Sequence, residues 1–199
     1  MPARRAAVDD SATRTALLDA AEAIMLDEGY AAVTTRRVGT RAGLNNALVF
    51  YYFGTVDALF IELFRRGAER SLARLDRALE SPQPLWAFWE LTHDFSSNAL
   101  IIEFTALANH RKAIRAEIAE YSRKFRTKQF ETLPAVLEGY GVDARRWPPE
   151  SLILLMAGFS RFMHMEQAFD LDLGHAETVA VIEREIRALE GDRRPDLLA

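Results

Sequence analysis

The chain has 199 residues, a formal net charge of −4 at pH 7 and no cysteine, which excludes disulfides and redox sensing through thiols. Hydrophobic residues make up 49% of it, enough to bury a core, but no apolar run reaches the roughly 18 residues of a membrane span. The N-terminus, MPARRAAVDD, lacks the apolar core of a signal peptide, so we expect a cytoplasmic protein without a membrane partner.

Apolar residues recur at helical spacing along almost the whole chain, and no stretch alternates in the manner of an exposed strand. The pattern predicts an all-α protein with about nine helices. The first helix is expected at residues 11–28, where Leu17, Ile24 and Met25 share one face and Gly29 follows the last turn.

Two short helices joined at a glycine are predicted between Thr34 and Leu59. Thr34 is a good N-cap for the first, and Gly43 can adopt the positive φ that commonly follows a helix end. The second helix should begin at Asn45 or Asn46, and the small Gly39 lets the two backbones approach closely. This layout is that of a helix-turn-helix DNA reader.

The outer faces of this helix pair carry side chains suited to nucleic acid. Asparagine can make paired hydrogen bonds to adenine, and apolar groups can touch a thymine methyl. Three arginines and no acid occur from Gly29 to Val56, a local cationic patch that suits phosphate contact. A solvated arginine face on an ordinary helix hairpin is the alternative reading. The candidate DNA contacts are Thr35, Arg36, Arg37, Arg41, Asn45, Asn46, Ala47, Phe50, Tyr51 and Tyr52.

This segment resembles the DNA-binding domain of the TetR family of bacterial transcriptional regulators. The matching residues are Gly29-Tyr30, Thr34-Thr35-Arg36-Arg37-Val38, Arg41-Ala42-Gly43-Leu44, Val49-Phe50-Tyr51-Tyr52-Phe53 and Ala58-Leu59. The remainder of the chain agrees with the family in length and helical layout. The resemblance implies that Thr35, Phe50 and Tyr51 touch phosphates or bases, and that residues 45–47 enter the major groove.

Four positions depart from the usual pattern of the family. Phe50 stands in place of tyrosine, Tyr52 in place of histidine, Val56 in place of lysine and Gly39 in place of alanine. Phe50 lacks a hydroxyl group and Val56 lacks a positive charge, so we expect weaker or differently placed phosphate contacts. The hydroxyls of Tyr51 and Tyr52 are the alternative donors.

A long fourth helix should start after its cap, Thr55, and end at Ser81-Pro82-Gln83-Pro84, because proline cannot continue the helical hydrogen bonds. The following helix should run through Trp86, Trp89 and Phe95 to a break near Ser96-Ser97-Asn98. The later helices are expected to run up to Asn109 and over residues 111–139, 150–169 and 176–189.

The helix from Glu150 to Phe169 contains a nearly unbroken apolar run, Leu152 to Phe159. A helix that is apolar on all sides must be buried on all sides, so one flank needs a partner. Together with the last helix, Ala176 to Leu189, it predicts a homodimer face. The resemblance implies the same four-helix bundle, which places two readers roughly 34 Å apart on DNA.

Aromatic and methionine side chains are frequent after Pro84, and such a stripe is more often core than ligand site. The TetR resemblance nevertheless implies an effector pocket enclosed by helices four to eight. Its candidate residues are Trp89, His93, Phe95, Asn98, Phe104, Phe125, Phe159, Ser160, Met163 and Glu166. The polar members of this set would orient an apolar ligand.

The sequence therefore predicts a ligand-responsive transcriptional regulator, a repressor that binds a near-palindromic double-stranded operator as a dimer and is released by an apolar small molecule. Residues 1–54, beginning with a flexible arm at 1–10, should bind DNA, and residues 55–199 should bind effector and dimerise. We expect no enzyme activity, metal or cofactor, because the four histidines are scattered along the chain. A helical carrier or sensor without DNA binding is the alternative.

Overall fold

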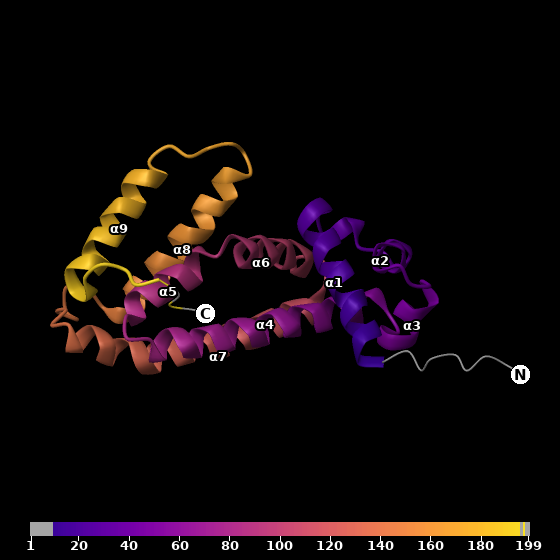
Figure 1. Cartoon of the computed structure of the whole chain (residues 1–199), viewed down its shortest axis with the longest axis horizontal. Helices are drawn as coiled ribbons and strands as arrows, with labels where there is room; N and C mark the ends of the chain where they lie inside the picture. Colours follow the sequence, from indigo (N-terminus) through magenta and orange to yellow (C-terminus); the bar gives the residue numbers. More distant parts are fainter. Residues whose placement is uncertain (1–9, 196, 198–199) are drawn as a thin grey trace, which may run out of the picture. The chain divides into compact units, whose positions relative to one another are not determined.

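The computed structural model describes residues 10–195 and 197, so the predicted arm lies almost wholly outside it. Across these residues there are nine α-helices, one short 3₁₀-helix and no strand, which confirms the all-α prediction. Their order can be followed in Figure 1, and their bounds are α1 (Asp10–Glu28), η1 (Tyr30–Ala32), α2 (Thr35–Ala42), α3 (Ala47–Phe53), α4 (Val56–Glu80), α5 (Pro84–His93), α6 (Phe95–Ala108), α7 (Lys112–Gly139), α8 (Pro149–Gln167) and α9 (His175–Glu190).

The chain divides into two compact units. The N-terminal unit is Met1–Gly67 with Leu100–Ile118, and the C-terminal unit is Ala68–Ala99 with Ala119–Ala199. Helices α4, α6 and α7 each contribute residues to both units. None of the described helices is by itself long and apolar enough to cross a membrane, although the bent pair of α3 and α4 passes that test together. The predicted functional boundary after residue 54 stays a prediction.

The first three helices enclose a core built from the apolar positions that recur at helical spacing in the sequence. The buried side chains of this core on α1, α2 and α3 are Leu17, Leu18, Ala21, Ile24, Met25, Val38, Val49 and Phe53. The first turns of α4 add Leu59, Phe60 and Leu63, each no more than 2% exposed. Burial of these side chains holds the short α2 and α3 in place, because helices of seven or eight residues are not stable alone.

The predicted helix ends are confirmed where the signal is local. The side chain of Thr34 accepts a hydrogen bond from the Arg37 amide at 3.3 Å, and Gly43 follows α2 in the left-handed region with φ of 66°. Thr55 Oγ1 accepts from the Ala58 amide at 3.0 Å at the start of α4. Pro84 occupies the first turn of α5, where proline is tolerated.

The predicted break near Ser96–Asn98 is wrong, because the chain breaks at Asp94 and α6 runs through those residues. Asp94 Oδ1 accepts from the Ser97 amide at 2.9 Å, which caps the new helix. Asn98 Nδ2 donates to the Thr92 carbonyl at 2.9 Å and ties α6 back to α5. At the other end, α8 stops at Gln167, two residues before the predicted Phe169.

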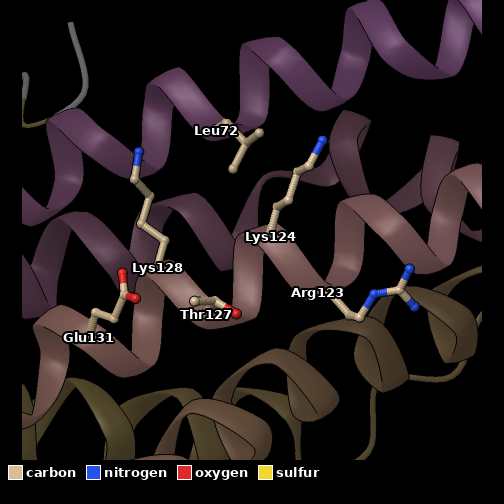
Figure 2. A pocket seen from close by; sticks show the side chains of 6 residues that line it. All are labelled: Leu72, Arg123, Lys124, Thr127, Lys128 and Glu131. Atoms are coloured by element: carbon tan, nitrogen blue, oxygen red, sulfur yellow. The ribbon is translucent and has the colours of Figure 1, made fainter.

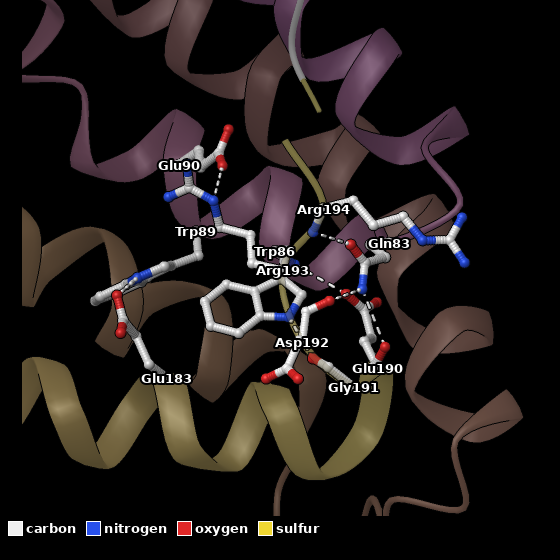
Figure 3. Close-up of polar contacts among 10 residues, drawn as sticks. All are labelled: Gln83, Trp86, Trp89, Glu90, Glu183, Glu190, Gly191, Asp192, Arg193 and Arg194. Carbon is white, nitrogen blue, oxygen red and sulfur yellow. Dashed lines mark hydrogen bonds and ion pairs between the residues drawn. The ribbon is translucent and has the colours of Figure 1, made fainter. Parts of the chain in front are cut away.

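In the C-terminal unit, a polar cluster joins the start of α5 to the end of α9, as Figure 3 shows. The carboxylate of Glu190, at the end of α9, accepts the backbone amides of Leu85 and Trp86 at 2.9 and 3.0 Å. It therefore caps a helix that lies more than a hundred residues away in sequence. Tyr140 donates to the same carboxylate at 2.9 Å, and burial together with this bond raises the pKa of Tyr140 to about 12.

Candidate nucleic-acid interface

Helix α3 has one buried and one exposed face. Val49 and Phe53 are buried against the unit, whereas Phe50 is 55% and Tyr51 is 72% exposed. Asn46 and Ala47, at the start of the same helix, are also exposed. Large aromatic side chains at such exposure are uncommon on a surface without a partner, so this face is a candidate contact surface.

The two asparagines before α3 have different surroundings. Asn45 Oδ1 accepts a hydrogen bond from the Ala47 amide at 2.9 Å, so the Asn45 side chain caps the helix. Among the residues that the structure describes, no partner is recorded for the Asn46 side chain. Asn46 is therefore the better candidate for reading a base, since both its amide oxygen and its amide nitrogen can pair with adenine.

Gly39 confirms the predicted close approach of α2 to the start of α3. A Cβ atom at this position would lie 2.8 Å from Cα and 2.9 Å from the backbone nitrogen of Asn46. It would also lie 3.1 Å from the Leu44 carbonyl oxygen. These are backbone atoms that cannot rotate away, so the absence of a side chain at Gly39 sets how closely the two helices pack.

The three arginines of α2 are not equivalent. Arg37 pairs with Glu28, and Arg41 Nη2 lies 2.8 Å from Asp27 Oδ2, both acids being at the end of α1. The hydrogen bond from Arg37 lowers the pKa of Glu28 and raises that of Arg37. Arg36 is exposed and has no recorded ion pair within the described residues. Sequence reasoning missed this difference, although the two acids stand directly before Gly29.

Tyr52 is also engaged within the unit. Its hydroxyl donates to Asp10 Oδ1 at 2.7 Å, and this bond raises the pKa of Tyr52. The Tyr51 ring lies edge-on to Tyr52, with centroids 5.0 Å apart, and its own side chain faces outward. Thr35 is half-buried at the first position of α2. Of the two alternative hydroxyl donors, Tyr51 is thus the more accessible.

A contact that sequence reasoning could not find holds the connection between α1 and α2. Glu103, on α6, accepts the backbone amide of Tyr30 at 2.7 Å. Gly29 beside it has a φ of 82°, and a Cβ there would lie 3.4 Å from the Glu103 carboxylate. The two partners are 73 residues apart in sequence, so no local sequence pattern predicts the contact.

Residues 17–63, which span this helix-turn-helix, match the family model of the bacterial regulatory proteins of the tetR family. The N-terminal unit carries a TetR-family domain. The resemblance predicted from the sequence is thereby confirmed for this segment, and helices α2 and α3 are its helix-turn-helix pair.

Solved structures share the fold over most of the chain. A Rhodococcus sp. protein described as a TetR-family regulator has a TM-score of 0.68 at 15% identity and covers 90% of this chain and 99% of its own. A Pseudomonas aeruginosa PAO1 regulator gives 0.68 at 17% identity, with 94% and 95% covered. A Saccharomonospora viridis regulator, solved in complex with choline, gives 0.61 at 15% identity, with 75% and 84% covered. No curated protein matches the chain in sequence.

Several predicted effector residues meet in the C-terminal unit. Ser160 Oγ lies 3.0 Å from both the Met156 carbonyl oxygen and His93 Nδ1, so the Ser160 hydroxyl is within hydrogen-bond distance of both groups. Burial lowers the pKa of His93, whose ring contacts Trp89 and Phe159. Trp89 is 3% exposed, and its Nε1 lies 3.4 Å from a carboxylate oxygen of Glu183.

The other predicted effector residues are placed differently. Phe125 packs against the core of the C-terminal unit, and Met163 is 9% exposed. Glu166 pairs with His175 at 2.7 Å, across the connection from α8 to α9. Phe104 belongs to the N-terminal unit, where its ring meets Phe64 with centroids 5.1 Å apart. The side chain of Phe95 lies outside the part of the chain that is described.

Proposed function

We propose that the chain is a ligand-responsive transcriptional repressor, which binds a near-palindromic operator as a homodimer and is released by an apolar small molecule. The observation that carries the proposal is the exposed face of α3 within a TetR-family domain. On that face Asn46 reads a base and Phe50 and Tyr51 contact the edges of the groove, while Arg36, on α2, contacts a phosphate.

The exposed surface of α8 supports dimerisation. Leu155, Phe162 and Met165 recur at intervals of seven and three residues on α8, Phe169 follows in the turn after the helix, and each is at least 50% exposed in the single chain. Helical spacing of this kind places them on one stripe, which is too apolar to remain in water. A two-fold pairing of this stripe, together with α9, buries it and brings the two DNA readers into one assembly.

The cluster around Trp89, His93 and Ser160 supports a ligand site in the C-terminal unit. It combines aromatic surface with a few oriented polar groups, which is the usual composition of a small-molecule site. The choline complex of the Saccharomonospora viridis regulator provides a precedent for ligand binding on this fold. Release from DNA requires only that the ligand bind the conformation that does not bind DNA more tightly than the one that does. Helix α4 couples the ligand site to the DNA-binding domain, because it runs from one unit into the other.

The proposal is tested by a gel-shift titration of the purified dimer on the DNA that flanks its own gene, against excess random DNA. We expect specific binding at nanomolar concentration, with an affinity that falls as salt rises. Asn46→Ala should weaken specific binding by about 1–3 kcal/mol, roughly 5- to 150-fold, and leave random binding unchanged.

Asn109→Ala is the matched control, because Asn109 is an exposed asparagine of the same unit that lies outside the helix-turn-helix. Equal loss on operator and random DNA in Asn46→Ala would refute base reading by that residue. A folded dimer that binds no sequence selected from random DNA, yet binds apolar ligands independently of salt, would favour the carrier alternative.

A further inference from the structure

The connection between α1 and α2 depends on a carboxylate from a distant helix. Gly29 follows α1 and turns the chain with a φ of 82°, and η1 begins at Tyr30. The amides of Ala32 and Val33 find backbone acceptors inside this turn, at 3.2 and 3.1 Å. The Tyr30 amide precedes these bonds, as is usual at the start of a helix, and its acceptor is the carboxylate of Glu103 at 2.7 Å.

This bond lies directly before the helix-turn-helix. Val33, which is 4% exposed, follows η1, and Thr34 caps α2. A displacement of Tyr30 therefore moves the start of α2. Helix α3 moves with it, because Gly39 packs so closely on Asn46 that an added Cβ would lie 2.8 Å from the Asn46 Cα. The orientation of the exposed face of α3 thus depends on where the connection is held.

Glu103 reaches the connection from a well-packed part of α6. Its neighbours Phe104 and Leu107 are 3% and 1% exposed, and the Phe104 ring lies 5.1 Å from that of Phe64 on α4. A Cβ on Gly29 would lie 3.4 Å from the Glu103 carboxylate, so the fit is close on the side of the connection as well. A side chain that is fixed in this way can position the backbone that it binds.

The other end of α6 is tied to the C-terminal unit, in which the helix begins. Asn98 Nδ2 donates to the Thr92 carbonyl of α5 at 2.9 Å. Asp94, which caps α6, lies 2.6 Å from Arg74 Nη1 on α4. A change in α5 therefore acts on one end of a continuous helix whose other end holds the Tyr30 amide.

We propose that Glu103 is a positioning residue for DNA binding. Its carboxylate holds the Tyr30 amide and sets the orientation of the helix-turn-helix without itself contacting DNA. A movement of α6 that breaks this bond lowers operator affinity and leaves the DNA-contacting side chains unchanged. The inference rests on the proposed function and deepens it, because it assigns part of the control of DNA binding to one pair of atoms.

The test is a titration of the full-length dimer with its operator, for two variants of the acid. Glu103→Ala removes the acceptor, whereas Glu103→Gln removes the charge and keeps an acceptor oxygen. We expect Glu103→Ala to weaken operator binding roughly tenfold, because losing one charge-assisted bond leaves about a tenth of the molecules with the connection in place. Glu103→Gln should bind within about threefold of the wild type.

Glu131 provides the control for the loss of a negative charge. It is exposed on α7 in the C-terminal unit and lines the shallow groove of about 450 Å³ between α4 and α7 that Figure 2 shows. Glu131→Ala removes the same charge as Glu103→Ala, far in sequence from the connection. It should bind operator like the wild type.

A double-mutant cycle identifies the donor. Tyr30→Pro removes the amide hydrogen at the first position of η1, where the fixed φ of proline is tolerated, and Tyr30→Ala removes only the side chain. Tyr30→Pro should bind operator roughly tenfold more weakly than Tyr30→Ala, which tests the bond even if Glu103→Ala does not fold. Adding Glu103→Ala should cost roughly tenfold in Tyr30→Ala and less than about twofold in Tyr30→Pro.

Thermal unfolding by circular dichroism shows which variants are folded at the temperature of the titration. Wild-type affinity in Glu103→Ala, an equal loss in Glu103→Gln, or additive effects in the cycle would overturn the inference. Any of these results with specific binding by the wild type leaves the proposed function standing. A wild-type dimer that binds no DNA sequence would instead overturn the proposed function and this inference together.

Discussion

Replacing Gly39 by alanine tests how the two helices of the DNA reader are held together. Alanine is the usual residue at this position in the TetR family, and in an open helix it would stabilise the chain by about 1 kcal/mol. In this structure the added Cβ would meet the Asn46 backbone at 2.8 Å. We therefore expect the ordinary effect of a glycine-to-alanine change to be reversed.

The size of the effect follows from the displacement that the methyl group requires. Moving the Cβ contact from 2.8 Å to the 3.4 Å of ordinary packing shifts the start of α3 by about 0.6 Å. Overpacking of this kind costs about 1–3 kcal/mol, so the net loss of unfolding free energy is about 0–2 kcal/mol. The same shift exceeds the tolerance of a hydrogen bond from Asn46 to a base, so we expect specific DNA affinity to fall roughly 5- to 150-fold.

Thermal unfolding and operator titration of the variant measure the two effects. A loss of 1 kcal/mol lowers the midpoint by about 2–4 °C in a chain of this size. Gly67→Ala is the control, because Gly67 lies within α4 and its added Cβ meets no atom within 4 Å. Gly67→Ala should be stabilising. A rise in the midpoint for Gly39→Ala that equals the rise for Gly67→Ala, with wild-type operator binding, would refute the reasoning.

Four further outcomes are expected. Asn45→Ala removes the cap of α3, costs about 1 kcal/mol of unfolding free energy in chemical denaturation, and weakens binding to operator and random DNA alike. Arg36→Gln lowers the slope of log affinity against log salt by about 0.9 per protomer. Arg37→Gln lowers it less, because Arg37 already pairs with an acid of α1. Equal changes in the two variants would argue against this difference in pairing. Phe162→Glu converts the dimer to a folded monomer in analytical ultracentrifugation, because the charge falls on the exposed stripe of α8. Burial lowers the pKa of His93 below its ordinary 6.5, so the unfolded chain binds a proton more readily than the folded protein. The unfolding free energy therefore falls as pH drops below about 6.5, by at most about 1.4 kcal/mol per pH unit. In urea unfolding curves between pH 7 and 5, His93→Gln should flatten this dependence.

The helix-turn-helix was predictable because its signals are local. Thr34 and Thr55 cap helices through bonds that span three residues, and Gly43 needs only its own backbone conformation. The apolar spacing of α1 and α4 likewise follows from neighbouring turns of one helix. The confirmed predictions of the fold all share this short range.

The misplaced break at Ser96–Asn98 shows the limit of such reasoning. Serine and asparagine are as frequent before a helix as between helices, and the structure uses Asp94 as the cap and Asn98 as a tie to α5. The bond from Tyr30 to Glu103 and the capping of α5 by Glu190 join residues that are 73 or more positions apart. Contacts of that range depend on tertiary packing, and a single sequence contains no pattern for them.

The pairing of Arg37 and Arg41 with acids of α1 has a consequence for how affinity is distributed. Arginines that already hold a carboxylate gain less from a phosphate, because each must first give up its partner. Phe50 also lacks the hydroxyl group and Val56 the positive charge that the family usually has at these positions. The helix-turn-helix therefore has few unpaired polar or charged side chains for the phosphate contacts that dominate binding to random DNA. In the proposed dimer, operator affinity would then come mainly from α3 and from the linkage of the two DNA-binding domains, where the second contact benefits from a high effective concentration. We therefore expect the proposed dimer to discriminate strongly against isolated half-sites, since a single DNA-binding domain would bind DNA weakly.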